Sequence, residues 1–143
     1  MHLIHRHLSE ASARPASEQV RLRAERRQFL KRRWRGVAED GTEFGFDLEA
    51  RLPDGALVFR TEAYDYIVLQ EPETVYVVRP GSADEAALIG WKIGNLHLPV
   101  EISGGLVRVL HDPAVRQLCE REGWPVLEET VIFKPLRVVP HAS

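Results

Sequence analysis

The first half of the chain alternates hydrophobic and polar residues with a period of two, which is typical of strands that bury one face. Val20, Leu22 and Ala24 show the pattern clearly, and the Asp-Gly pair at 40–41 is a hairpin turn signal. Together these signals predict strands over residues 20–24, 34–39, 42–46, 56–60 and 64–69. No helix of ordinary length is needed before residue 81. We therefore predict an all-β domain over residues 1–72, built as a compact barrel or sandwich.

The pattern changes after Glu71-Pro72-Glu73. Ser82 with Glu85 three residues later is a capping box, and the helix that it begins runs to Gly94. Asp112 followed by Pro113 predicts the start of a second helix. Strands are predicted over residues 74–78, 98–102, 106–110 and 125–133. The order βαββαβ predicts a ferredoxin-like domain over residues 73–135, followed by a tail over 136–143, so the chain is α+β as a whole.

The junction between the first of these helices and the next strand contains a single histidine. Gly94 and Asn95 tolerate the left-handed conformation, so we expect them to end the helix. His97 follows, and Pro99 then fixes the backbone. A rigid turn of this kind is suited to presenting a ligand nitrogen, and it is equally an ordinary way to connect a helix to a strand.

Composition narrows the class of protein. The single cysteine, Cys119, excludes an internal disulfide and any zinc site built on several cysteines, and we expect it to lie in the core. No apolar run approaches the roughly 18 residues of a membrane-spanning helix, and the N-terminus lacks a signal-peptide pattern. These features predict a cytoplasmic protein that does not bind membranes. The residues also include no acid–base pair, nucleophile set or glycine-rich phosphate loop, so we expect no enzymatic activity.

The formal net charge is only −2, but the charge is unevenly distributed. Residues 1–36 hold ten Lys/Arg and three Asp/Glu, whereas residues 37–143 hold nine and eighteen. Because the remaining chain is acidic and the arginines fall on the solvent faces of predicted strands, the pattern favours docking to an acidic protein surface over nucleic-acid binding. Residues 1–8 could form a short strand, and His2, His5 and His7 within them are a second candidate metal segment. A mobile terminus is the simpler interpretation.

The segment Ile93-Gly94-Asn95-Leu96-His97-Leu98-Pro99-Val100 resembles the Gly-Asn-x-His-x-Pro segment of the UreE urease accessory proteins, the nickel metallochaperones of urease maturation. The similarity continues through Leu110-His111-Asp112 into the second helix. It also includes Asp40-Gly41 and Leu52-Pro53-Asp54-Gly55 in the first half, and covers roughly residues 20–135.

The resemblance implies a homodimer formed through the C-terminal domain, with His97 of each subunit meeting its mate at the two-fold axis to hold one metal ion. Many relatives carry another histidine two residues after the position of His111, where this chain has Pro113, and many end in a histidine-rich tail, of which only His141 remains. The candidate metal ligands are therefore His97, His141 and His111. We expect transfer of single ions and not bulk storage.

The implied cargo is Ni²⁺, although imidazole nitrogens also accept Zn²⁺ and Cu²⁺ in vitro. The implied partners are the urease apoprotein and its accessory complex, including the urease-maturation GTPase. The alternative is a non-catalytic protein-interaction module of that complex with a vestigial metal site.

Overall fold

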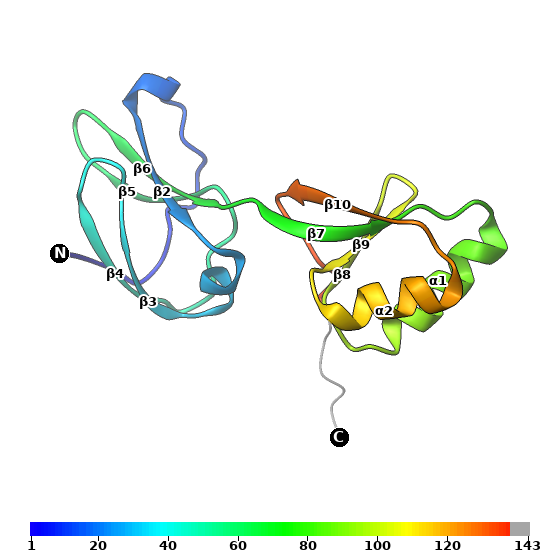
Figure 1. Cartoon of the computed structure of the whole chain (residues 1–143). Helices are drawn as coiled ribbons and strands as arrows, with labels where there is room; N and C mark the ends of the chain where they lie inside the picture. The colour runs from blue at the N-terminus through cyan, green and yellow to red at the C-terminus, as the bar shows by residue number, and fades with distance from the viewer. Residues whose placement is uncertain (138–143) are drawn as a thin grey trace. The chain divides into compact units, whose positions relative to one another are not determined.

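The computed structural model describes residues 1–137. The chain forms two compact units, Met1–Glu71 and Pro72–Ser143, which are considered separately (Figure 1). No helix among the described residues is long and apolar enough to cross a membrane.

The first unit is built from six strands and two short 3₁₀ helices (Figure 1). These are β1 (His2–Ile4), η1 (Ala16–Glu18), β2 (Gln19–Ala24), η2 (Arg26–Leu30), β3 (Arg33–Val37), β4 (Glu43–Asp47), β5 (Ala56–Arg60) and β6 (Asp65–Gln70). The strands make two three-stranded sheets with orders β1-β4-β3 and β2-β6-β5. The expectation of an all-β first half is confirmed.

The two sheets of this unit enclose an aromatic core. Phe44 is fully buried, and Trp34 stacks on Phe46 with ring centroids 4.3 Å apart. The neighbouring sheet edges are joined by backbone hydrogen bonds. The N–H of Leu8 donates to the Leu57 carbonyl at 2.8 Å, and the N–H of Glu39 donates to the Arg21 carbonyl at 2.8 Å. The sandwich is thereby tied at both edges.

The sequence left a short strand and a mobile terminus open for residues 1–8, and the structure has the strand. His2, Leu3 and Ile4 form a strand that pairs in parallel with β4, and Ile4 lies in the core. The partner strand begins about forty residues later in the sequence. Local sequence patterns cannot predict such a pairing, because the stabilising contacts come from a distant strand.

A buried carboxylate connects the N-terminal loop to the β5–β6 hairpin. Asp65 is fully buried; it accepts hydrogen bonds from Arg60 Nε at 2.8 Å and Ser12 Oγ at 2.5 Å, and Arg14 Nε lies 3.2 Å away. The hydrogen bond from Arg60, and to a smaller extent that from Ser12, lowers the pKa of Asp65 to about 2, although burial opposes the shift. The loop before β2 is therefore held by charge-assisted hydrogen bonds.

Replacing Asp65 with Asn keeps the side-chain shape but removes the charge. We expect the free energy of unfolding at pH 7 to fall by about 2–3 kcal/mol, as for the loss of buried hydrogen bonds to a charged group. Asp47→Asn is the matched control, because the Arg33–Asp47 pair is exposed, and it should cost less than about 1 kcal/mol.

The difference in unfolding free energy between wild type and Asp65→Asn has a defined pH dependence. Because the folded-state pKa of Asp65 lies below its ordinary value of 3.8, its contribution is complete above that value and is lost as the pH falls through about 2. Urea denaturation should show the difference between wild type and Asp65→Asn shrinking over this window. A difference that stays constant down to pH ~2 would contradict the assignment.

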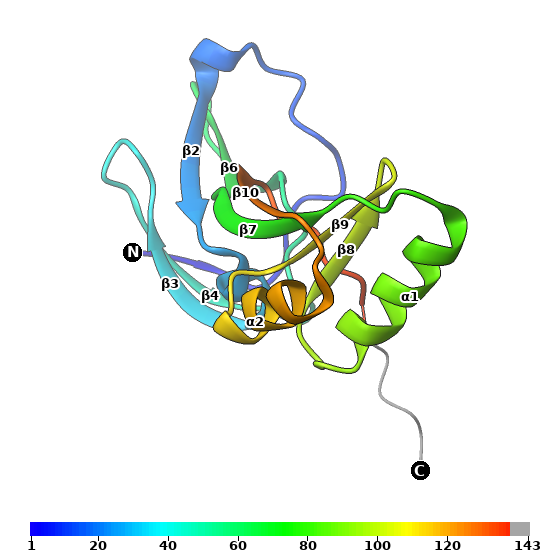
Figure 2. The ribbon, with the colours of Figure 1, turned by 45° about the vertical axis from the view of Figure 1, so that its right-hand side comes forward.

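The second unit has the order βαββαβ, with both helices on one face of its sheet (Figures 1 and 2). Its elements are β7 (Glu73–Val78), α1 (Ala83–Gly94), β8 (Val100–Ser103), β9 (Leu106–Leu110), α2 (Pro113–Glu122) and β10 (Val126–Val131). The sheet is antiparallel with order β10-β7-β9-β8, which confirms the predicted ferredoxin-like arrangement. Beneath the helices, Ile89 and Val115 join Val109 in a fully buried core.

The helix caps follow the sequence signals closely. Ser82 Oγ accepts the Glu85 N–H at 3.1 Å, but the Glu85 carboxylate returns to the Gly81 N–H at 2.9 Å and so caps one residue earlier than in the standard box. Asp112 accepts the Ala114 N–H at 2.9 Å at the start of α2. Both helices therefore begin where the sequence predicts.

Candidate metal site

The left-handed residue after α1 is His97, and this corrects the prediction that Gly94 and Asn95 would take that conformation. Asn95 keeps right-handed helical geometry with φ −69°. The last turn then tightens, because the Leu96 N–H donates to Ile93 and the His97 N–H donates to Gly94. His97 has φ +57° and is the one residue other than glycine with positive φ in the part of the chain that the structure describes.

The residues on either side of His97 hold it in place. Leu96 and Leu98 are partly buried against the core of the second unit, whereas His97 itself is exposed. Pro99 follows, and its carbonyl accepts the Leu110 N–H at 3.2 Å. The two leucines and this hydrogen bond fix the backbone, so the imidazole is presented to solvent from a rigid turn.

This conformation is energetically unfavourable for histidine. A left-handed backbone costs a residue with a Cβ about 1–2 kcal/mol, and Gly94 and Asn95, which tolerate it better, stand only three and two residues away. Residues held in such conformations concentrate at functional sites, where the surrounding structure over-determines them. The outlier therefore identifies His97 as the first candidate for a functional role.

Two substitutions at this position separate strain from side-chain loss. His97→Gly and His97→Ala both remove the imidazole, but glycine adopts positive φ without a steric clash. In metal-free protein, His97→Gly should be more stable than His97→Ala by about 1 kcal/mol in urea denaturation. The reverse order is expected only if residue 97 is right-handed, where alanine is the better residue.

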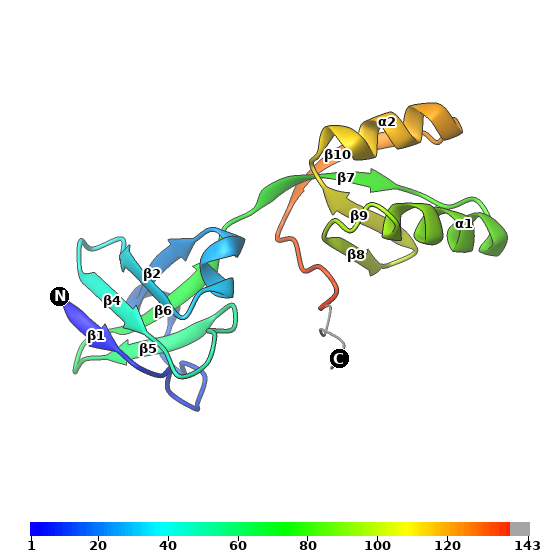
Figure 3. The ribbon, with the colours of Figure 1, turned by 90° about the horizontal axis from the view of Figure 1, so that it is seen from below.

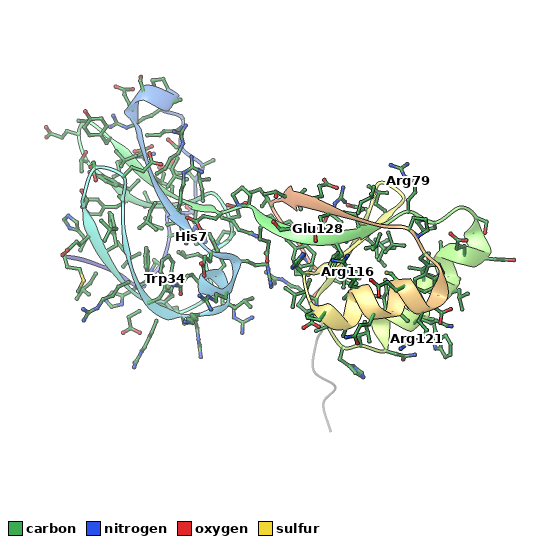
Figure 4. All side chains as sticks on the ribbon, in the orientation of Figure 1. His7, Trp34, Arg79, Arg116, Arg121 and Glu128 are labelled. Atoms are coloured by element: carbon green, nitrogen blue, oxygen red, sulfur yellow. The ribbon has the colours of Figure 1, made fainter. Side chains whose placement is uncertain are left out.

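His111 is already engaged within its own unit. Its ring stacks on Tyr76 with centroids 4.4 Å apart and planes at 17°, and its Nε2 lies 2.9 Å from Glu128 Oε1. Glu128 on β10 is labelled in Figure 4, together with Arg116 on α2, which pairs with Glu120. A metal ion at His111 would have to use Nδ1 or displace Glu128.

The other sequence candidates are not brought together. His141 lies outside the described residues. At the N-terminus His2 stacks on Phe59, while the Nδ1 atoms of His5 and His7 lie 3.0 and 2.7 Å from the Asp47 and Leu8 carbonyls. Over residues 1–137 there is no group of three or more His, Cys, Asp or Glu side chains that could hold a metal ion. A site built on His97 therefore needs ligands from elsewhere.

Cys119 is buried, as the helical pattern predicts. Burial raises the pKa of its thiol, which disfavours the thiolate form that binds metals.

An exposed apolar stripe on α1 was not anticipated from the sequence. Trp91 is 66% exposed and Leu88 44% exposed, three residues apart on one side of the helix, with Ala87 beside them. The buried face of the same helix is formed by Ile89 and Ile93. The available signal was the presence of large apolar residues on two faces of a twelve-residue helix. The stripe runs along α1 toward the end that carries His97.

The basic run of the first unit is largely neutralised within that unit. Met1–Glu71 contains twelve Lys/Arg and twelve Asp/Glu, and pairs such as Arg23–Glu39 and Arg33–Asp47 join basic residues to acidic ones that follow in sequence. Lys31, Arg32 and Arg35 are exposed without an ion pair among the described residues. Trp34, labelled in Figure 4, lies between the arginines of β3 and packs inward.

Comparison with known proteins defines the class of this chain. The C-terminal domain of UreE urease accessory proteins matches residues 73–142. The chain is 33% identical over 138 residues to the urease accessory protein UreE of Pseudomonas putida, covering 94% of this chain and 81% of that protein. It is 31% identical over 116 residues to UreE of Bacillus cereus, covering 79% and 77%. With UreE of a Synechococcus strain it is 34% identical over 91 residues, covering 64% of this chain and 61% of that protein.

The chain belongs to the UreE family of urease accessory proteins. These are nickel metallochaperones of urease maturation and not enzymes, which agrees with the resemblance seen in the sequence.

Proposed function

We propose that this chain carries nickel ions to the urease apoprotein and that His97 is its principal metal ligand. The supporting observation is the exposed imidazole on a left-handed backbone after α1. Strain of this kind would be relieved by a single substitution to glycine. Its presence therefore favours an active carrier over an interaction module with a vestigial site, which is the alternative.

A second copy of the chain supplies the additional imidazole. In a two-fold symmetric interface each residue lies near its own copy if it lies near the axis. Burying Trp91 and Leu88 of α1 against the same stripe of another subunit removes exposed apolar surface from water. Because His97 follows the same helix, such an interface brings the two imidazoles toward one axis.

The proposed donor set suits a cargo ion. Two fixed imidazoles are fewer than the four ligands of a closed structural site, so binding is weaker and release is easier. Nickel is the family's cargo, although imidazole by itself also accepts zinc and copper. His141 supplies a further donor from the tail, and His111 ranks after it because Glu128 already occupies its Nε2.

The partners that we propose are the urease apoprotein and the accessory complex with its GTPase, in the cytoplasm. In the first unit the docking surface would centre on Lys31, Arg32 and Arg35, three exposed cations for which no ion pair is found in that unit. An acidic partner surface is the complementary one.

Nickel titration by calorimetry tests the role of His97. We expect one tightly bound ion per two chains in the wild type, and a loss of affinity of more than about tenfold, or about 1.4 kcal/mol, in His97→Ala. His5→Ala, another exposed histidine, is the control and should bind as the wild type does. Unchanged stoichiometry and affinity in His97→Ala would refute the assignment.

Sedimentation velocity tests the proposed dimer face. Trp91→Glu places two like charges in the interface, so we expect a monomer at micromolar concentration and loss of the nickel site. Leu127→Glu is the matched control, because Leu127 on β10 is 68% exposed, and it should remain dimeric. A Trp91→Glu protein that stays dimeric and binds nickel normally would exclude this face.

A further inference from the structure

The outer face of one sheet in the first unit exposes apolar side chains. In the sheet β1-β4-β3, Phe44 and Phe46 lie in the core, so the residues that alternate with them point away from it. Leu3 on β1 and Val37 on β3 lie on this outer face, and they are 65% and 59% exposed. Figure 3 shows β1 at the edge of the sheet, beside β4. The outer face of a sheet with one buried face is normally polar, so these exposed side chains point to a binding surface.

Gly45 on β4 gives two of the apolar side chains a defined position on this face. A Cβ at Gly45 would lie 3.1 Å from Leu3 Cδ2 and 3.2 Å from Met1 Cε, so both side chains lie across the strand at this point. Gly45 is buried beneath them, whereas Met1 is itself 63% exposed. Glycine inside a strand is destabilising and often marks a close approach. Met1 and Leu3 therefore form an apolar platform that remains open to solvent.

Arg35 places an unpaired cation in the same row of the sheet as Leu3. Both residues lie opposite Gly45 in the register, one on each neighbouring strand. Arg35 is exposed, and it makes no ion pair among residues 1–137. Glu43, a carboxylate of the same face, lies one row away opposite Val37. A free guanidinium in the row of an apolar platform is complementary to a carboxylate that flanks an apolar side chain.

An open cleft extends the outer face at its other end. The cleft has a volume of about 460 Å³ and is lined by Arg32, Arg33, Asp47 and Leu48. Arg33 is engaged with Asp47 at 3.0 Å, whereas Arg32 is exposed and no ion pair is found for it in this unit. Leu48 is buried and contributes an apolar wall. The cleft therefore repeats the combination of a free guanidinium and an apolar surface.

We propose that this outer face binds a protein surface on which an apolar side chain is flanked by carboxylates. The apolar side chain would lie on Met1 and Leu3, and the carboxylates would pair with Arg35 and Arg32. The inference rests on the proposed function, in which the first unit docks the urease apoprotein complex, and it adds an apolar anchor to that docking surface.

The charge of the first unit supports this kind of partner. Met1–Glu71 holds equal numbers of basic and acidic residues, so the unit as a whole does not attract an acidic protein. Recognition has to come from local complementarity, which fixes orientation and specificity more than affinity. In protein interfaces most of the affinity comes from a few buried anchors inside a polar rim. The platform of Met1 and Leu3, with Arg35 in its row, provides an anchor and a rim of this kind.

Surface plasmon resonance with the immobilised urease apoprotein complex tests the proposal on the full-length chain. Leu3→Lys removes the apolar anchor but adds a cation, so a purely electrostatic surface would bind it at least as well as the wild type. We expect it to lose more than about tenfold in affinity, and Arg35→Glu to lose at least as much. Leu3→Met keeps an apolar side chain and should bind as the wild type does.

Tyr64→Lys is the matched control. Tyr64 is 44% exposed on the hairpin between β5 and β6, in the other sheet of the same unit, and this substitution also replaces an exposed apolar residue with lysine. It should not change the affinity for the complex. Nickel titration of all four variants should match the wild type, because the substitutions lie outside the second unit.

Each contrary result has a distinct meaning. Wild-type or tighter binding by Leu3→Lys would overturn the apolar anchor, and an equal loss in Tyr64→Lys would overturn the choice of this face. Self-association of the wild type that Leu3→Lys abolishes, with unchanged binding to the complex, would assign the face to a second copy of the chain and overturn the proposal. A wild-type chain that binds nickel but not the apoprotein complex would refute delivery to urease, and this inference with it. Absence of nickel binding, with docking to the complex intact, would refute the carrier role alone.

Discussion

His97 has a left-handed backbone conformation that costs an L-amino acid about 1–2 kcal/mol. The packing of the second unit prevents His97 from changing to a right-handed conformation. Ile93 anchors the end of α1 in the core, Leu96 and Leu98 pack on either side, and the Pro99 carbonyl is bonded to β9. The ferredoxin-like fold provides this support because it places the end of its first helix next to the start of an edge strand. The residue at the strained position is the one side chain there with a metal-binding nitrogen.

The proposed carrier role follows from this constraint together with symmetry. A single exposed imidazole is a weak ligand, and the described residues of one chain form no group of three or more His, Cys, Asp or Glu side chains that could hold a metal ion. The apolar stripe of Trp91 and Leu88 on α1 offers a way to pair two copies. The site is then assembled at an interface between two copies of the chain, with fewer fixed ligands than a closed structural site. Such an arrangement suits an ion that must be released.

Much of the fold could be predicted from sequence, because it is determined by local signals. The capping residues Ser82 and Asp112, the alternating strands and the turn glycines act within a few positions, and the α+β architecture derived from them is confirmed. What was missed depends on distant partners. The parallel pairing of β1 with β4, the burial of Asp65 under Arg14 and Arg60, and the stacking of His111 on Tyr76 all join residues that no local pattern relates. The left-handed conformation was assigned to Gly94 or Asn95 on propensity, whereas the tightened last turn of α1 moves it to His97. The metal roles of His97, His111 and His141 stay predictions.

Anomalous diffraction at the nickel absorption edge, from crystals of the nickel-loaded protein, tests the central claim most directly. We expect one anomalous peak on a two-fold axis between two copies of the chain, within coordination distance of both His97 imidazoles, with Trp91 buried nearby. A peak at His111 and Glu128 within a single chain, with His97 far from any ion, would contradict it.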